Sequence, residues 1–179
     1  MLIKWIATLI VAINANRRAG EIAAGVACGC LLGIIPSGNM LWVVLFILTF
    51  FIKINLAVEL LFLALFKLLA PLLEGLLHSL GYFVLTQPFL QGLFTSLYNV
   101  PLVPYSQFNN TIVMGGLIGG IILWLPVFFL FHQLVILYRK KLRDKIAGSK
   151  IIKAFGKLPF VDGIAQAVKK LGGIYAGVS

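Results

Sequence analysis

Long apolar stretches without formal charge dominate the pattern of the chain. Residues 22–52 contain no Asp, Glu, Lys or Arg, and neither do residues 75–138. Each stretch exceeds the roughly 20 apolar residues that cross the hydrocarbon core of a bilayer. The pattern therefore predicts an all-α integral membrane protein. We expect a broken or re-entrant helical hairpin, about two further spans, and an amphipathic interfacial helix at each end.

Residues 19–54 contain two apolar helical halves around a polar break. The break consists of Pro36, Ser37, Gly38 and Asn39. Proline lacks a backbone N–H donor, glycine has a permissive backbone, and Ser and Asn are good helix caps. The second half covers only about 20 Å at 1.5 Å per residue, which is short for an untilted crossing. We expect a re-entrant hairpin whose polar tip lies at membrane depth. Two thin crossings are the alternative, and both return the chain to its starting side.

Two groups of glycines predict close contact between helices. Small residues on one helix face let a neighbouring backbone approach, and GxxxG spacing is typical of such faces in membranes. The second group could pack within the chain, against the face of the first, or between subunits, and we favour the packing within the chain. The helix-packing glycines are Gly25, Gly29 and Gly33 in the first group and Gly115, Gly116, Gly119 and Gly120 in the second.

Residues 55–85 predict a helix that is kinked at Pro71 and carries a polar stripe in an apolar setting. On one continuous helix its four ionisable groups fall within an arc of about 100°. They could reach out to the membrane interface, or they could face a cavity or a partner, because ionisable groups in membrane segments usually avoid lipid. The stripe consists of Asn55, Glu59, Lys67, Glu74 and His78.

The remaining membrane segment and the positive charges predict the topology. Residues 86–109 form an uncharged outer loop, and residues 110–138 form the last span. Arg17 and Arg18 precede the first membrane segment, and a basic cluster follows the last. Positive charges close to short spans lie on the cytoplasmic side. We therefore expect a multipass protein of the bacterial cytoplasmic (inner) membrane with both termini in the cytoplasm.

Both ends of the chain predict contact with the membrane surface. Residues 1–16 are expected to form an interfacial amphipathic helix. Residues 139–179 form a basic amphipathic cytoplasmic tail. This tail has ten basic and two acidic groups, so it carries most of the chain's net charge of +10. An apolar stripe opposite lysines favours anionic phospholipids over nucleic acid. The expected lipid contacts are Arg139, Lys140, Lys141, Arg143, Lys145, Lys150, Lys153, Lys157, Lys169 and Lys170.

The composition excludes several functional classes. Hydrophobic residues make up 61% of the chain and charged residues 11%, which excludes intrinsic disorder and a secreted disulfide scaffold. Cys28 and Cys30 project about 200° apart on a helix, so they cannot pair with each other. The sequence contains no catalytic motif and no plausible acid–base pair. We expect a protein without enzymatic activity, metal or cofactor.

One motif resembles a known family. The pattern Gly29-x-x-x-Gly33-x-x-Pro36-x-Gly38-Asn39 is followed by a short apolar helix and Lys53-x-Asn55. It resembles bacterial membrane proteins of the domain-of-unknown-function family 2062, over residues 15–145. A branch of these proteins is typically encoded beside a large periplasmic AsmA-like protein, of a class associated with lipid movement. The resemblance implies an inner-membrane subunit that anchors or feeds such a lipid-transfer partner. A small transporter or channel component, or a membrane-shaping structural protein, is the alternative.

Overall fold

The computed structural model describes residues 18–142, and all the regular structure in this part of the chain is helical. The prediction of an all-α protein is thus confirmed. The expected helix at residues 1–16 and the basic tail beyond residue 142 lie outside the described residues. The elements are α2 (Ala19–Ile34), α3 (Met40–Thr49), α4 (Leu56–Leu85), η1 (Pro88–Leu90), α5 (Gln91–Tyr98), η2 (Val103–Ser106), α6 (Thr111–Leu137) and the π-helical turn η3 (Tyr138–Leu142).

Asparagine side chains begin the three helices that follow a break in the chain. The side-chain oxygen of Asn39 accepts from the backbone N–H of Trp42, that of Asn55 from Val58, and that of Asn110 from both Ile112 and Val113. A helix leaves its first N–H groups without partners inside the helix, and Asn is among the best residues at satisfying them. These caps fix where α3, α4 and α6 start.

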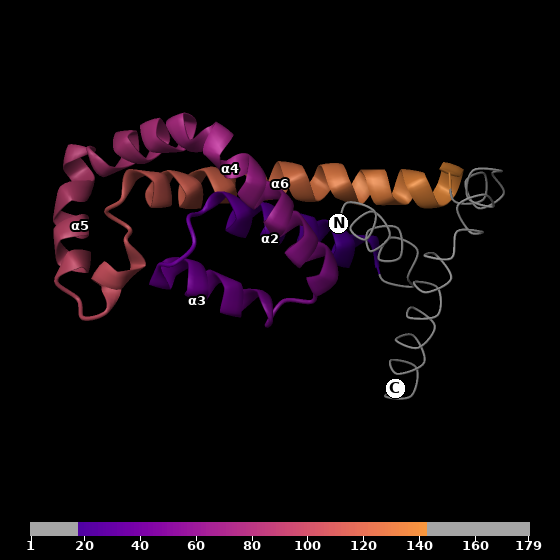
Figure 1. Cartoon of the computed structure of the whole chain (residues 1–179), viewed down its shortest axis with the longest axis horizontal. Coiled ribbons are helices and arrows are strands. Elements are labelled where there is room, and N and C mark those ends of the chain that lie inside the picture. Colours follow the sequence, from indigo (N-terminus) through magenta and orange to yellow (C-terminus); the bar gives the residue numbers. More distant parts are fainter. Residues whose placement is uncertain (1–17, 143–179) are drawn as a thin grey trace.

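Helix α2 forms the centre of the fold (Figure 1). It packs against both α4 and α6, which also pack against each other. Residues from Ile22 to Cys30 are all buried, and Leu32 to Ile35 are buried as well. An apolar cluster at one end of this core joins α2 to the other two helices. Its buried members are Ile22, Val26, Val58, Phe62 and Val135.

The contacts of α2 show the direction of its neighbours. The first half of α4 runs parallel to α2, because Gly25 lies beside Val58, Gly29 beside Phe62 and Gly33 beside Phe66. Helix α6 runs antiparallel to α2, because its Gly116 lies beside Ile35 and its Gly120 beside Leu31. Helix α3 connects the end of α2 to the start of α4, so it runs in the opposite direction to both. Helices α2 and α3 therefore form a hairpin that returns to its starting end.

The glycines of the first group lie where α2 meets α4. A Cβ atom added at Gly29 would come within 2.5 Å of the carbonyl oxygen of Glu59, and one at Gly25 within 2.7 Å of the carbonyl oxygen of Asn55. At Gly33 the side chain of Phe66 would be in the way. Backbone atoms cannot give way as a flexible side chain can. Any larger residue at these positions would push the two helices apart.

The glycines of the second group do not face the first group. Gly116 and Gly120 contact the last turn of α2, whereas Gly115 faces the backbone of Leu77 in α4. Gly81 in α4 meets the backbone of Thr111 at the start of α6. Both groups of glycines therefore lie at contacts within the chain. These contacts join α2 to α4, α2 to α6 and α4 to α6.

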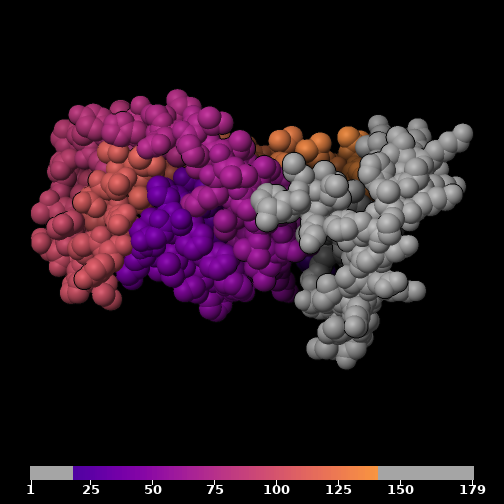
Figure 2. Space-filling view, in the orientation of Figure 1, coloured from indigo at the N-terminus to yellow at the C-terminus, as the bar shows by residue number. Residues whose placement is uncertain are grey.

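The two longest helices leave most of their apolar surface uncovered. Helices α4 and α6 are long and apolar enough to cross a membrane, and the most apolar 18 residues of each are only 17% and 28% buried. Pro71 lies inside α4, where it removes a backbone hydrogen bond. The ribbon of α4 bends along its length (Figure 1). Figure 2 shows α3 and the segment between α4 and α6 side by side on one face of the molecule, where α3 contacts η2.

Two glycines on α4 provide a matched test of this packing. A Cβ added at Gly81 would collide with the carbonyl group of Thr111, whereas nothing lies within 4 Å of one at Gly75. We expect Gly81→Ala to lower the free energy of unfolding by about 1–3 kcal/mol through overpacking. Gly75→Ala should raise it by up to about 1 kcal/mol, because glycine weakens a helix interior. Unfolding of the two purified variants in the same detergent measures both values. Equal stability would contradict the close approach of α4 and α6.

Candidate functional site

The base of the hairpin is where the chain enters α2 and later begins α4. The backbone N–H of Asn55 donates a hydrogen bond of 3.0 Å to the carbonyl oxygen of Glu21. This bond joins the first turn of α2 to the residue that caps α4. It closes the hairpin into a loop whose two ends are fixed to each other.

The tip of the hairpin is held by Asn39, which is only 3% exposed. Its Nδ2 donates to the carbonyl oxygen of Pro36 at 2.7 Å, and its Oδ1 accepts from the backbone of Trp42 at 2.8 Å. Gly38 has a φ of +94°, in the left-handed region that favours glycine. Ser37 and Gly38 are exposed, and Pro36 is half-buried. Of the four predicted tip residues, Asn39 thus organises the turn.

Carbonyl groups at the end of α2 are satisfied by side chains from two other helices. The indole Nε1 of Trp42 donates to the carbonyl oxygen of Leu32 at 2.9 Å. The ammonium group of Lys67 donates to the carbonyl oxygen of Ile35 and lies 5.9 Å from the centre of the Trp42 ring. A cation at the C-terminal end of a helix also interacts favourably with the helix dipole. Lys67 and Trp42 together therefore cap α2.

Glu59 lies near the base of the hairpin and is completely buried. Neither carboxyl oxygen has a hydrogen-bond partner among the described residues. The neighbouring hydroxyl of Thr49 donates instead to the carbonyl oxygen of Phe46 at 2.7 Å. A buried polar group without a partner is rare in folded proteins and calls for an explanation.

The predicted polar stripe is divided between different surroundings. Asn55 and Glu59 belong to the base of the hairpin, and Lys67 reaches its tip. Glu74 is exposed beyond the bend of α4. The Nδ1 atom of His78 lies 2.7 Å from Thr111 Oγ1, at the start of α6. The stripe therefore lines no common cavity in the part of the chain that the structure describes.

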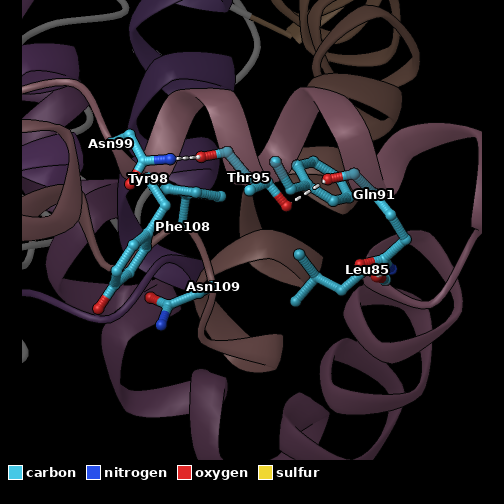
Figure 3. A pocket seen from close by; sticks show the side chains of 8 residues that line it. Leu85, Gln91, Thr95, Tyr98, Asn99, Phe108 and Asn109 are labelled. Atoms are coloured by element: carbon cyan, nitrogen blue, oxygen red, sulfur yellow. Dashed lines mark hydrogen bonds between the residues drawn. The ribbon is translucent and has the colours of Figure 1, made fainter.

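An open pocket of about 340 Å³ lies at the far end of the fold, between α5 and the loop that leads into α6 (Figure 3). It combines aromatic and aliphatic side chains with amides and a hydroxyl, and none of its lining residues is charged. Figure 3 shows Tyr98, Phe108 and Asn109 on one side and Gln91 and Leu85 on the other. The lining residues are Leu85, Gln91, Phe94, Thr95, Tyr98, Asn99, Phe108 and Asn109.

The described residues offer little for metal or phosphate chemistry. They contain no group of three His, Cys, Asp or Glu side chains that could hold a metal ion. Of the predicted lipid-contacting residues, Arg139, Lys140 and Lys141 begin the basic cluster in η3. The predicted contacts from Arg143 onward lie outside the described residues.

Two side chains of this site could not be identified from sequence patterns. In the sequence, Trp42 and Thr49 look like ordinary residues of an apolar helix. Their importance depends on groups that are distant in sequence: Trp42 donates to Leu32, and Thr49 lies near Glu59. Only the antiparallel return of α3 alongside α2 and α4 brings these groups together. The spacing from Asn39 to Trp42 was the one local signal, because it is that of a helix cap and its acceptor.

These features define a helical protein with two helices long and apolar enough to cross a membrane, and with a buried acidic residue beside a capped hairpin. Over residues 4–144 the chain matches the family described as uncharacterized protein conserved in bacteria (DUF2062), and it belongs to this family. It is 34% identical over 145 residues to an uncharacterized protein of Treponema pallidum (strain Nichols). The match covers 81% of this chain and 90% of that relative. No solved structure matches the chain significantly. The family resemblance of the glycine–proline motif is confirmed.

The tip predicts a difference between two neighbouring polar residues. Asn39→Ala removes a helix cap and the bond to Pro36, so we expect a loss of about 1–2 kcal/mol in the free energy of unfolding. Ser37→Ala changes an exposed side chain and should stay within about 0.5 kcal/mol of the parent. Unfolding of both variants in one detergent makes the comparison. If Ser37→Ala proved the more damaging, the assignment of Asn39 as the organising residue would be wrong.

Proposed function

We propose that this protein is a non-enzymatic, multipass subunit of the bacterial cytoplasmic membrane, which anchors or feeds a partner protein in lipid transfer across the cell envelope. Helices α4 and α6 cross the bilayer, and the α2–α3 hairpin re-enters it from the cytoplasmic side. Both termini lie in the cytoplasm. The basic residues after α6 contact anionic phospholipids there.

The observation that carries this proposal is the apolar surface of α3, α4 and α6. At 1.5 Å per residue, α4 covers about 45 Å and α6 about 40 Å, enough to cross a hydrocarbon core of about 30 Å even when bent or tilted. Soluble monomers rarely expose apolar patches larger than a few hundred Å². Here Leu68, Leu72 and Leu76 on α4 are 71–79% exposed, and Phe51 after α3 is 83% exposed. Lipid is the environment in which this surface is stable.

The hairpin supports the re-entrant arrangement. At 10 residues, α3 covers about 15 Å, which is half of a bilayer core. Backbone groups at a break inside lipid must find partners in the protein. The tip meets this requirement through Asn39, Trp42 and Lys67. The bond between Asn55 and Glu21 keeps both arms at the same side.

The outer end of the fold supports a role in contact with a partner. The segment between α4 and α6 carries no formal charge and contains the open pocket beside α5. Aromatic side chains together with a few polar groups are typical of binding surfaces. We propose that the partner is an AsmA-like lipid-transfer protein that docks at this end. The family resemblance supplies the class of partner, and the uncharged pocket supplies a surface for it.

The topology gives one direct prediction. Single cysteines at Asn109 and at Ser179, each in a chain with Cys28→Ala and Cys30→Ala, should react with a membrane-impermeant thiol reagent from opposite sides of the cytoplasmic membrane. Asn109 should be labelled in cells whose outer membrane is permeabilised, and Ser179 only in inverted vesicles. Labelling of both positions from the same side would overturn the proposed topology.

Photo-crosslinking tests the partner. We expect a photoreactive amino acid at Tyr98, which lines the outer pocket, to crosslink an AsmA-like envelope protein in living cells. The same group at Leu72, on the exposed surface of α4, should crosslink phospholipid alone. Mass spectrometry of the products identifies both. Phospholipid alone at both positions would remove the partner from this end of the protein, and the membrane topology would be unaffected.

A further inference from the structure

The buried carboxyl group of Glu59 has no role in anchoring or in partner contact. It is 0% exposed, and both of its oxygens lack hydrogen-bond partners among the described residues. A carboxylate that is shielded from solvent is costly when it is ionised, and no described residue pairs with this one. A neutral carboxylic acid has no net charge to compensate, and it can donate a hydrogen bond as well as accept one.

Each element packed around Glu59 offers a different kind of neighbour. Helix α2 contributes the thiol of Cys28, and its close backbone at Gly29 leaves no room for a side chain. Helix α3 contributes Thr49, which is 4% exposed and holds its own proton on the carbonyl oxygen of Phe46. Thr49 lies near the acid, and it makes no hydrogen bond to either carboxyl oxygen.

The other ionisable groups around the hairpin do not supply a counter-charge for Glu59 in the described structure. Lys67 is eight residues further along α4, about 12 Å, and donates to Ile35. Arg18 before the start of α2 and Lys53 before the start of α4 are both exposed. Helix α3 contains no ionisable residue, and the one in α6, His132, stacks on Phe128. Glu21, in the first turn of α2, is itself acidic.

We propose that Glu59 is a proton-binding site, and that loss of its proton opens the base of the hairpin. In the closed state the buried carboxyl group keeps its O–H bond and is neutral. On release, this O–H bond breaks, its electron pair stays on the carboxylate, and the proton passes to a water molecule. Glu59 lies in the first turn of α4, where the helix dipole favours a negative charge, so the ionised form is accessible once water arrives.

Helix α3 is the wall that can admit this water. At the tip, Trp42 donates to Leu32 and Asn39 donates to Pro36, whereas at the base Thr49 bonds only within α3, to Phe46. The outer face of α3 is exposed between the tip and the base, at Val43, Val44, Ile47 and Leu48. Helix α2, by contrast, is locked against α4 by backbone contact at its glycines. Hydration of the carboxylate therefore displaces α3 and leaves the core of α2, α4 and α6 in place.

The chemistry of the site favours a proton over a metal cation. Hard cations such as Ca²⁺ take six to eight oxygen ligands, as a rough rule. In the part of the chain that the structure describes, the side-chain oxygens near Glu59 are those of its own carboxylate and the hydroxyl of Thr49. The described residues also hold no cluster of three metal-binding side chains. The bound cation is a proton.

This inference goes beyond the proposed function and does not depend on the partner, so it is tested on the purified full-length protein in phospholipid vesicles. Infrared spectra at neutral pH should show the carbonyl band of a protonated carboxylic acid. The band should shift on ¹³C-labelling of glutamate, disappear in Glu59→Gln and remain in Glu74→Gln, whose side chain is exposed. Absence of the band from the parent protein, or its retention in Glu59→Gln, would overturn the proton site. If Glu59→Gln fails to fold, retention of the labelled band in both Glu21→Gln and Glu74→Gln assigns it to Glu59, because the chain contains three glutamates.

Amide hydrogen exchange of α3 reports on opening, because the N–H groups of a helix exchange when that helix opens locally. Exchange becomes faster with pH in any variant, so the informative quantity is the exchange rate of α3 in the parent relative to Glu59→Gln. While deprotonation limits opening, this ratio should rise by up to about tenfold per pH unit. A ratio that stays constant with pH would overturn the opening step. Addition of Na⁺ or Ca²⁺ at fixed ionic strength should leave the ratio unchanged, and protection by either ion would overturn the choice of a proton.

Discussion

The need to satisfy backbone groups where α2 ends governs the arrangement of the hairpin. A helix leaves its last four carbonyl groups without partners inside the helix. The chain does not end α2 with a glycine cap, because the C-cap residue is Ile35. It brings an indole from α3 and an ammonium group from α4 to the carbonyl oxygens of Leu32 and Ile35. The positions of α3 and α4 relative to α2 follow from these bonds, and so does the burial of Asn39.

Close backbone contact is the second constraint, and it explains why α2 is the centre. With glycine at positions 25, 29 and 33, α2 approaches α4 more closely than side chains would allow, and its opposite side accepts Gly116 and Gly120 of α6. Dispersion depends steeply on distance, so such contacts stabilise helix pairs, even in lipid, which removes the hydrophobic drive for association. A helix of 16 residues can therefore hold together two helices nearly twice its length.

Local patterns predicted much of the fold and less of the site. The break at Pro36, the asparagine at its end, the proline in α4 and the spaced glycines are all signals within a few residues, and each lies where it shapes the backbone. The surroundings of Glu59 and Lys67 could not be predicted in this way. On a straight helix Glu59 and Lys67 belong to one polar face. In the fold, Glu59 lies at the base of the hairpin and Lys67 reaches its tip, and only the tertiary structure creates this hairpin. Trp42 and Thr49 act through the same distant contacts.

The closed hairpin also limits how the length of the chain can vary. One residue added to α3 would rotate everything after it by about 100° and displace it by about 1.5 Å. Trp42 and Thr49 could then no longer meet Leu32 and Glu59 at the same time, while Asn55 stayed joined to Glu21. The connection from residue 86 to residue 109 carries no such double attachment. Homologues of different length should therefore gain or lose residues there, and keep the interval from Glu21 to Asn55 constant.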